Sequence, residues 1–327
     1  MEYRKVGNSE LEVSVVGLGC NNLGRAHTPT ESQEGTNKVI GAAIDAGINF
    51  FDCADMYGKE PGLSETMLGK ALANDRDKVI VATKFGLPVN GANGENKDEA
   101  RGSASYIRKS VESSLKRLNT DYIDLYQFHT PDPETQIEET LAELNKLVKE
   151  GKVRYIGNCN FAGWQIGEAH FTAQLEETEH FISVQNHYNL LDRRAELEVM
   201  PVAKHLGLGM FPYFPLANGL LTDKYRDPKE RENTKNRLVH SKQDVLAAAD
   251  WDQLEKYYQF CDANNLSVTE ATFSWLAAQK PIASVIAGGT TEEQIKANAK
   301  AVSWKPTESE LVEIDKIFPS PDKVALF

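Results

Sequence analysis

In the sequence Gly47-Ile-Asn-Phe-Phe-Asp-Cys-Ala-Asp-Met-Tyr-Gly58, an apolar segment passes directly into ionisable residues. Phe50 and Phe51 are bulky residues suited to a buried strand, and Asp52 comes at its end. The glycine at the end of the stretch closes a loop before a segment with helical spacing. We therefore predict a strand whose carboxyl end carries Asp52 and Tyr57.

The same order of strand, polar end, loop and helix recurs along the chain. Segments with helical spacing lie between the strands, for example at 105–118 and 135–150, and the second ends in basic residues before a glycine. Eight such units indicate a closed parallel (β/α)8 TIM barrel rather than an open sheet. We expect its strands at 15–19, 50–54, 79–84, 123–129, 155–160, 182–189, 210–216 and 284–288.

Three segments lie outside the eight strand-helix units. Residues 3–14 alternate around a Gly-Asn-Ser turn, which predicts an N-terminal β-hairpin. The segment 221–245 after the seventh strand is long, polar and charged, and loops of that length are usually functional or mobile. Extra helices are expected after strand seven and at the C-terminus, where 308–318 has helical spacing. The whole chain, 1–327, is predicted to be a single domain.

Composition narrows the function. The chain has 327 residues, a net charge of -12 and a pI of about 5.2, so its field repels nucleic acids and anionic membranes. No secretion signal and no bilayer-length apolar segment is found, which predicts a cytoplasmic protein. The four cysteines show no CxxC spacing, so we expect reduced thiols and neither a metal site nor a disulfide.

Four polar residues end predicted neighbouring strands or follow them, namely Asp52, Tyr57, Lys84 and His129. Active sites of such barrels lie at the carboxyl-end face. Each residue alone has a structural interpretation: the lysine as a solvated strand end, the histidine as a hydrogen-bonded core residue, the aspartate as a loop cap. Their occurrence together indicates a catalytic site.

The four groups have a joint chemistry. A tyrosine titrates at about 10 in water, and an ammonium about 4 Å away lowers that pKa by roughly three units at an effective dielectric of about 20. Lys84 could thus bring Tyr57 into working range, while Asp52 orients Lys84 and cancels part of the shift. His129 can hydrogen-bond to a substrate oxygen. Such a set protonates a carbonyl oxygen while a reductant attacks the carbon.

Further motifs surround these residues: Phe-Phe-Asp-Cys-Ala-Asp-Met-Tyr-Gly at 50–58, Thr-Lys at 83–84, Asp-Leu-Tyr-Gln-Phe-His-Thr-Pro-Asp-Pro at 124–133, Ile-Gly-Asn-Cys-Asn-Phe at 156–161 and Val-Gln-Asn-His-Tyr-Asn at 184–189. With them the chain resembles the aldo-keto reductase family along nearly its whole length. The resemblance implies an Asp-Tyr-Lys-His tetrad with Tyr57 as general acid and an aldehyde or ketone as substrate. It also implies NADPH as hydride donor, with NADH as an alternative.

The resemblance also implies where the cofactor binds, since Gly17-Leu-Gly19 is a poor match to a Rossmann fingerprint. The family's contacts to the nicotinamide amide fall on Cys159, Asn160 and Gln185, and a stacking aromatic falls on Tyr213. Many members hold the 2′-phosphate with Lys, Ser and Arg where this chain has Gly288, Gly289 and Gln294. The remaining expected cofactor contacts are Gly19, Cys20, Asn21, Leu216, Asn218, Lys224, Arg237, Gly288, Thr290, Gln294 and Asn298.

Other functions remain open from the sequence. One is a regulatory subunit of the channel-associated type, which binds the cofactor without turnover. Another is a Schiff-base lyase using Lys84, although the adjacent Asp52 opposes the loss of its proton. Cys159 stands where the family more often has serine, which raises the hypothesis of oxidation sensitivity. Substrate choice is expected to depend on the loops 23–30 and 85–101 and on the tail 318–327.

Overall fold

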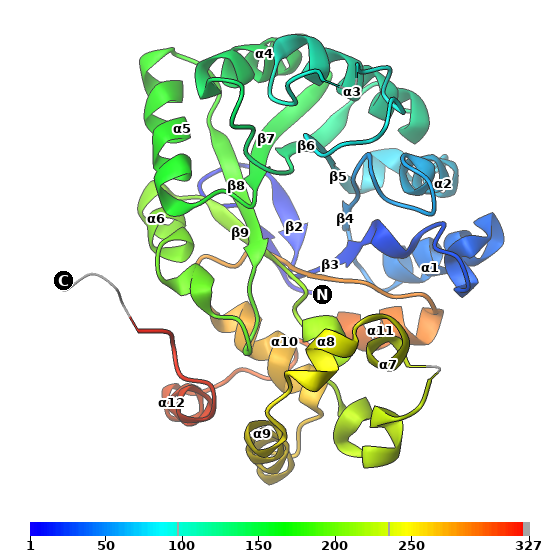
Figure 1. Cartoon of the computed structure of the whole chain (residues 1–327), viewed down its shortest axis with the longest axis vertical. Helices are drawn as coiled ribbons and strands as arrows, with labels where there is room; N and C mark the ends of the chain where they lie inside the picture. The colour runs from blue at the N-terminus through cyan, green and yellow to red at the C-terminus, as the bar shows by residue number, and fades with distance from the viewer. Residues whose placement is uncertain (97, 235, 323–327) are drawn as a thin grey trace.

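Eight parallel strands form the centre of the computed structural model, which describes residues 1–96, 98–234 and 236–322, with the backbone alone at Arg237 (Figure 1). All eight expected strands are present, with their ends shifted by a few residues. They follow one another around the sheet in the order β10-β3-β4-β5-β6-β7-β8-β9. Their bounds are β3 (Val16–Gly19), β4 (Phe50–Asp52), β5 (Ile80–Phe85), β6 (Ile123–Phe128), β7 (Val153–Cys159), β8 (Phe181–His187), β9 (Gly209–Tyr213) and β10 (Val285–Ala287).

The sheet closes on itself between β9 and β10. Met210 forms a parallel bridge with Ile282, just before β10. The Met210 amide donates to the Pro281 carbonyl at 3.0 Å, and the Ala283 amide donates to the Met210 carbonyl at 3.0 Å. The (β/α)8 barrel predicted from the sequence is therefore confirmed.

Helices surround the barrel because each has one apolar face. In α4, for example, Leu141, Leu144 and Leu147 are buried at a spacing of three residues, while both lysines of the helix are exposed. The helices that alternate with the barrel strands are α1 (Gln33–Asp45), α2 (Leu63–Ala71), α3 (Ala104–Leu118), α4 (Ile137–Lys149), α5 (Gly163–Leu175), α6 (Val199–Leu206), α10 (Val268–Ala278) and α11 (Glu292–Lys300).

The expected N-terminal hairpin covers the amino end of the barrel. Strands β1 (Tyr3–Lys5) and β2 (Glu12–Ser14) pair antiparallel, and the Asn8 amide donates to the Gly207 carbonyl at 2.8 Å. Val6 and Val13 belong to one buried cluster with side chains from the barrel interior, including Phe50. The four predicted catalytic residues lie at the opposite end, where the strands of the barrel end or their loops begin.

The segment 221–245 folds into short helical turns rather than an extended loop. Buried Tyr225 and Leu238 anchor it to the core, and the Arg231 guanidinium lies 3.6 Å from the centre of the Trp251 ring. These turns are η6 (Asp223–Arg226), η7 (Pro228–Arg231), α7 (Arg237–Ser241) and α8 (Gln243–Ala247), followed by α9 (Trp251–Ala263). The expected extra helices after the seventh barrel strand are thus confirmed.

The C-terminal helix is also confirmed as α12 (Glu308–Ile317). It is followed by Phe318, which is 2% exposed and packs edge-on against Tyr257 with ring centres 5.1 Å apart. The end of the tail, 323–327, lies outside the described residues. In the described part of the chain, no helix is both long and apolar enough to cross a bilayer.

Candidate active site

Three adjacent strands bring the four predicted catalytic side chains together. Asp52 ends β4, Lys84 lies near the end of β5, and His129 directly follows β6. The Lys84 Nζ donates to Asp52 Oδ2 at 2.7 Å and to the Cys53 carbonyl at 2.7 Å. Tyr57 comes from the loop after β4, and its ring centre is 5.0 Å from Lys84 Nζ and 6.0 Å from the His129 ring centre.

Lys84 is held as a buried ammonium. Burial alone pulls its pKa down, but the charge of Asp52 and the nearby Tyr57 outweigh this and raise the pKa above its ordinary value. The other oxygen of Asp52 accepts hydrogen bonds from Gln127 at 3.1 Å and Gln185 at 3.0 Å. A Schiff base needs a neutral amine, so this geometry argues against a lyase that uses Lys84.

The direction of the Tyr57 pKa shift differs from the expectation. Desolvation by burial raises its pKa above 10, Lys84 opposes that shift, and Asp52 adds to it. The expected net lowering of the pKa is wrong, because desolvation by burial outweighs the lowering by Lys84, and the Asp52 carboxylate, 2.7 Å from the ammonium, adds to the rise. Tyr57 is therefore a neutral phenol at physiological pH, able to donate a proton to an oxygen that becomes strongly basic.

His129 is a neutral imidazole. Burial, followed by the charge of Lys84, holds its pKa well below the usual range, and its Nδ1 is buried without a hydrogen-bond partner among the described residues. Its carbonyl accepts from Asn160 Nδ2 at 2.8 Å, and the Tyr213 hydroxyl donates to Asn160 Oδ1 at 2.8 Å. These bonds connect the catalytic end to two predicted cofactor contacts.

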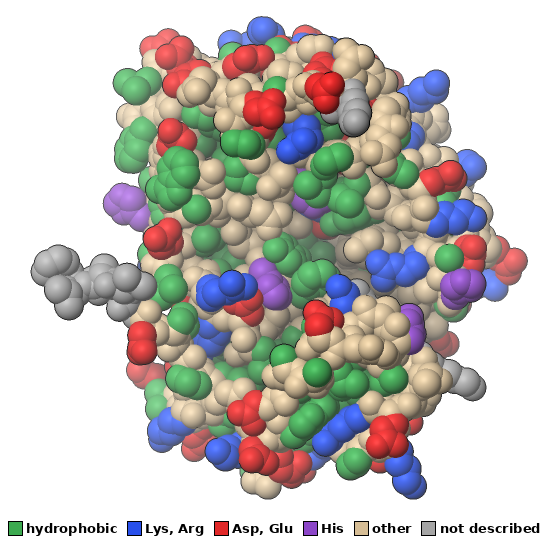
Figure 2. Space-filling model, viewed as in Figure 1, with side chains coloured by type: hydrophobic (Ala, Val, Ile, Leu, Met, Phe, Trp, Pro, Cys, Tyr) green, Lys and Arg blue, Asp and Glu red, His purple; other side chains and the backbone are tan. Residues whose placement is uncertain are grey.

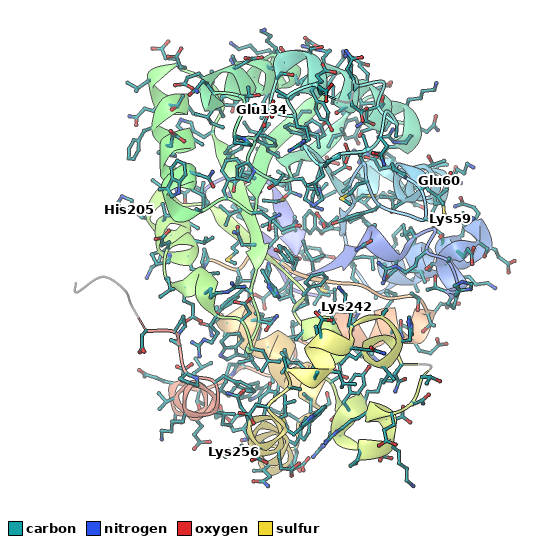
Figure 3. All side chains as sticks on the ribbon, viewed as in Figure 1. Lys59, Glu60, Glu134, His205, Lys242 and Lys256 are labelled. Atoms are coloured by element: carbon teal, nitrogen blue, oxygen red, sulfur yellow. The ribbon has the colours of Figure 1, made fainter. Side chains whose placement is uncertain are left out.

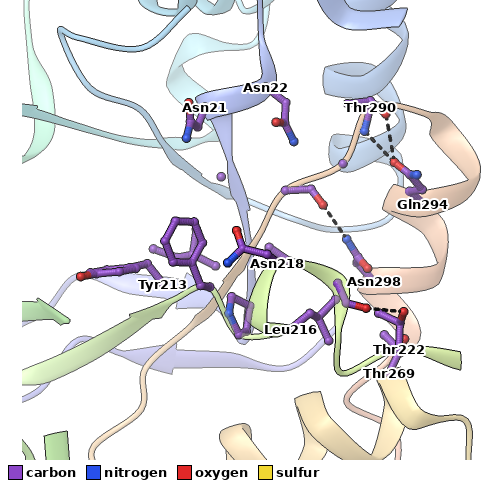
Figure 4. Close-up of a pocket in the computed structure, with 18 of the residues that line it drawn as sticks. Asn21, Asn22, Tyr213, Leu216, Asn218, Thr222, Thr269, Thr290, Gln294 and Asn298 are labelled. Carbon is purple, nitrogen blue, oxygen red and sulfur yellow. Dashed lines mark hydrogen bonds between the residues drawn. The ribbon is translucent and has the colours of Figure 1, made fainter. Parts of the chain in front are cut away.

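A cavity of about 1390 Å³ opens over the carboxyl ends of the strands. It hollows the centre of the face seen in Figure 2, and Figure 4 shows the part between Tyr213 and Gln294. Of the predicted site residues, those that line it are Asp52, Tyr57, His129, Gly19, Asn21, Asn160, Gln185, Tyr213, Leu216, Asn218, Lys224, Gly288, Thr290, Gln294 and Asn298.

Several predicted residues do not reach the cavity surface. Lys84 is fully buried, as are Cys20 and, at 1% exposure, Cys159. Burial raises the pKa of both thiols, and the Cys159 Sγ donates to Gln127 Oε1 at 3.8 Å. Cys159 is thus a packed thiol rather than a reactive thiolate. The Arg237 side chain lies outside the described residues, so its phosphate contact stays a prediction.

The two loops expected to select the substrate differ in whether they reach the cavity. The loop after β3 lines the cavity with four consecutive residues, 25–28, whereas none of the described residues of 85–101 does. The second loop instead turns inward, where Val89 and Asn93 are buried. Of the described tail, Phe318, Pro319 and Pro321 border a separate hollow.

Sequence reasoning missed part of the lining. Phe214 follows the predicted stacking Tyr213, is 40% exposed and has a φ of 53°, and only its place after a strand could have indicated it. Arg25 lies in the loop 23–30 that was expected to select the substrate, and several others lie in the segment 221–245 that was expected to be functional, although none of them was named singly. The lining residues of 267–269 and 300–303 come from segments whose local sequence carries no sign of the cavity. The missed residues include Asn22, Arg25, Phe214, Thr222, His240, Lys242, Ser267, Thr269, Lys300 and Ser303.

The lining suits a dinucleotide. Asn218 has a φ of 60°, and its Oδ1 is buried without a partner among the described residues. A Cβ at Gly288 would lie 2.8 Å from Asn22 Nδ2, so a side chain there would crowd the cavity. Thr290 and Gln294 lie at the other end from Tyr213, at the start of α11 (Figure 4). An aromatic ring at the catalytic end and amides and lysines toward the other match a nicotinamide and its phosphates.

Comparisons with known proteins identify the family. A family model described as "Aldo/keto reductase family" matches residues 15–318. The "Uncharacterized oxidoreductase YrpG" of Bacillus subtilis (strain 168) is 36% identical over 98% of this chain and 97% of its own length. The "Probable aldo-keto reductase 1" of Glycine max is 34% identical over 97% of this chain and 89% of its own. The chain therefore belongs to the aldo/keto reductase family of oxidoreductases.

Proposed function

We propose that this protein is an NADPH-dependent reductase of aldehydes or ketones, with NADH as an alternative donor and with the reverse alcohol oxidation on the same site. The observation that carries the proposal is the contact set at one end of the cavity. A neutral phenol and a neutral imidazole border it, and an ammonium is held behind the phenol by a carboxylate 2.7 Å away.

Each of these residues has a role in the proposed reaction. The bound nicotinamide supplies a hydride to the carbonyl carbon. Tyr57 donates its phenolic proton to the carbonyl oxygen, which becomes an alkoxide-like base as the hydride arrives. His129 hydrogen-bonds to the same oxygen, and Lys84 stabilises the phenolate that Tyr57 leaves behind. Asp52 is the positioning residue that keeps Lys84 charged and oriented.

The cofactor contacts follow the cavity. Asn160 and Gln185 would hold the nicotinamide amide, because carboxamides supply both donors and acceptors, and Tyr213 would stack on the ring. Lys224 is a cation available to the phosphates, and Asn298, whose Nδ2 donates to the Gly288 carbonyl at 3.3 Å, would contact the adenine.

The test is the Tyr57→Phe substitution with Tyr126→Phe as a matched control. Tyr126 is a buried tyrosine on β6 whose hydroxyl has no partner among the described residues, so removing that hydroxyl leaves packing intact. Tyr57→Phe should lower kcat for carbonyl reduction by roughly 10²- to 10⁴-fold while the Kd for NADPH, measured by fluorescence titration, stays unchanged.

Full turnover by Tyr57→Phe would refute the assigned role. Wild-type protein that binds NADPH yet reduces none of a broad panel of carbonyls would instead identify a cofactor-binding regulatory subunit. Titration with NADH beside NADPH measures the preference for the 2′-phosphate, for which Gly288, Gly289 and Gln294 offer no cation.

A further inference from the structure

Arg25 lies at the catalytic end of the cavity. It belongs to the loop between η1 (Cys20–Asn22) and η2 (Pro29–Glu31) and is one of the lining residues. The Lys59 amide donates to the Gly24 carbonyl at 3.1 Å, so this loop lies directly against the loop that carries Tyr57. The loop that carries Arg25 and the loop that carries Tyr57 therefore lie side by side at the wall of the cavity.

The Arg25 guanidinium has donors to spare. One nitrogen, Nη2, donates to Asn21 Oδ1 at 3.3 Å, and no carboxylate of the described residues lies within ion-pair distance of it. Other arginines are committed: Arg117 to Glu65 at 2.6 Å and Arg76 to Asp124 at 2.8 Å. A half-buried arginine with an unused planar fork at a cavity wall is poised to bind an anion.

The three lysines among the described residues of the cavity wall come from the C-terminal part of the chain. Lys224 lies on η6, Lys242 between α7 and α8, and Lys300 at the end of α11. Figure 3 shows Lys242 beside α8, away from Lys59 on the loop next to Arg25. In Figure 4, Asn21 lies on the side of Tyr213, whereas Asn22 lies on the side of Thr290 and Gln294. Asn21, which accepts a hydrogen bond from Arg25, thus lies on the side of the cavity where the nicotinamide is proposed to bind. The lysines suited to the phosphates lie elsewhere on the cavity wall.

The carboxylates that line the cavity already have partners, which leaves the charge of Arg25 available for an anionic substrate. Asp52, the cavity carboxylate at this end, is neutralised by Lys84, and the lining Glu270 is on α10, where it accepts from Ser303. The whole chain carries a charge of -12 and repels small anions at long range, so an anionic substrate needs a local cation. Tyr213 and Phe214 add aromatic surface to the same end.

We propose that Arg25 binds the carboxylate of the substrate, so that the preferred substrates are aldehydes or ketones that carry a carboxylate group. The inference rests on the proposed reductase function and names the substrate class of the same site. The guanidinium fork pairs with both oxygens of the carboxylate and holds the carbonyl in register with Tyr57.

The experiment compares 3- and 4-carboxybenzaldehyde with their methyl esters, which keep the shape and lose the charge. Wild type, Arg25→Ala and Arg25→Lys are assayed with NADPH. In Arg25→Ala the ratio of kcat/KM for acid over ester should fall about 10- to 100-fold, and Arg25→Lys should recover part of it because it keeps the charge without the fork. Lys59→Ala is the matched control, since it removes one positive charge from the same rim at a residue that does not line the cavity, and its ratio should not change.

Two binding measurements separate this inference from the proposed function. Calorimetric titration of benzoate into the NADP⁺ complex should show affinity that Arg25→Ala loses, and this readout needs no turnover. The Kd for NADPH should be the same in both proteins. A weakened NADPH Kd with an unchanged acid-to-ester ratio would make Arg25 a cofactor contact and overturn the proposal. Equal ratios and equal benzoate affinity in wild type and Arg25→Ala would overturn it as well.

Discussion

Asp55 is a buried carboxylate two residues before Tyr57. One oxygen accepts from Asn93 Nδ2 at 2.9 Å, and the other has no partner among the described residues. Burial, then the charge of Glu65, raises the pKa of Asp55 well above its usual value. A folded-state pKa above the unfolded value contributes stability that is fully present below about pH 4 and is lost as pH rises through the folded pKa.

Asp55→Asn should therefore stabilise the protein at pH 8 by on the order of 1–3 kcal/mol, because it removes an incompletely satisfied buried charge and keeps the acceptor for Asn93. The gain should vanish as pH approaches about 4, where the wild-type carboxyl is itself neutral. Urea unfolding at pH 8, 6 and 4 measures it. An equal effect at every pH would show that Asp55 is not desolvated.

The same substitution at another buried carboxylate, Asp124, should change the free energy of unfolding in the opposite direction. Asp124 is also fully buried but is paired with Arg76 and Arg154, both at 2.8 Å. Asp124→Asn should destabilise the protein by about 3 kcal/mol at neutral pH, because it leaves the largely buried Arg76 without its counter-ion. It lies near the amino end of β6, so NADPH-dependent turnover of the surviving folded protein should be unchanged.

The pH dependence of turnover follows from Tyr57 and His129. The raised pKa of Tyr57 keeps its acid form above about pH 10, and the lowered pKa of His129 keeps its neutral form below about pH 6. The kcat for carbonyl reduction should therefore be level from about pH 6 to 9, while alcohol oxidation, which needs the phenolate, should rise with pH. A decline in reduction centred near pH 7 would show that Lys84 does lower the pKa of Tyr57.

At the residue scale, the sequence predicted which side chains meet but not their ionisation. Asp52, Lys84 and His129 could be found because parallel barrel strands bring their carboxyl ends to one face. The direction of the Tyr57 pKa shift could not, since it depends on burial and on the 2.7 Å contact that cancels the charge of Lys84. The loop 23–30 was expected to select the substrate, but Arg25 could not be singled out within it, because only tertiary contacts place this loop beside the loop of Tyr57.

At the scale of elements, Arg193 is one of the residues that attach α12 to the rest of the fold, beside Gln253, which donates to the Ile317 carbonyl at 2.8 Å. Arg193 is 8% exposed, donates to Asp315 on α12 at 2.6 Å and to the Phe318 carbonyl at 2.5 Å, and lies 5.2 Å from the Trp275 ring centre. Arg193→Ala should lower the free energy of unfolding by about 3 kcal/mol. Hydrogen exchange should also become faster in 308–318.

Arg194 is the neighbouring control for that prediction. Its exposed side chain pairs only with Asp192 among the carboxylates of the described residues, at 2.6 Å. Arg194→Ala should change stability by no more than about 0.5 kcal/mol. Equal losses in the two variants would mean that the C-terminal helix is held by its apolar contacts alone.

Long periodic elements were predicted well, and short ones were not. The eight strands were found because apolar runs between turn residues are characteristic of buried strands. The turns η6 to α8 were read as a polar loop, since helices of four or five residues are too short to show an apolar period. These turns are held in place by two buried side chains, Tyr225 and Leu238, which pack into the core.

At the scale of the whole molecule, cofactor binding should stabilise the fold. The cavity joins β3, β9, β10 and the turns after β9, so a ligand that fills it links segments far apart in sequence. NADPH at about 100 times its Kd should add about 2.7 kcal/mol to the free energy of unfolding, read as a rise in the unfolding temperature. Tyr57→Phe should show the same rise, and absence of any shift in wild type would contradict the assigned cofactor site.

The hairpin under the barrel has a consequence for biosynthesis. Arg4 donates to the Ala277 carbonyl at 2.6 Å across a separation of 273 positions, and Asn8 contacts Gly207. While the ribosome is still making the middle of the chain, the hairpin can pair within itself, but Arg4 and Asn8 lack these two partners. The apolar floor of the barrel is then exposed to chaperones and to other nascent chains until translation has passed Ala277. Such a high contact order implies slow maturation, with yield limited by how long that floor stays uncovered.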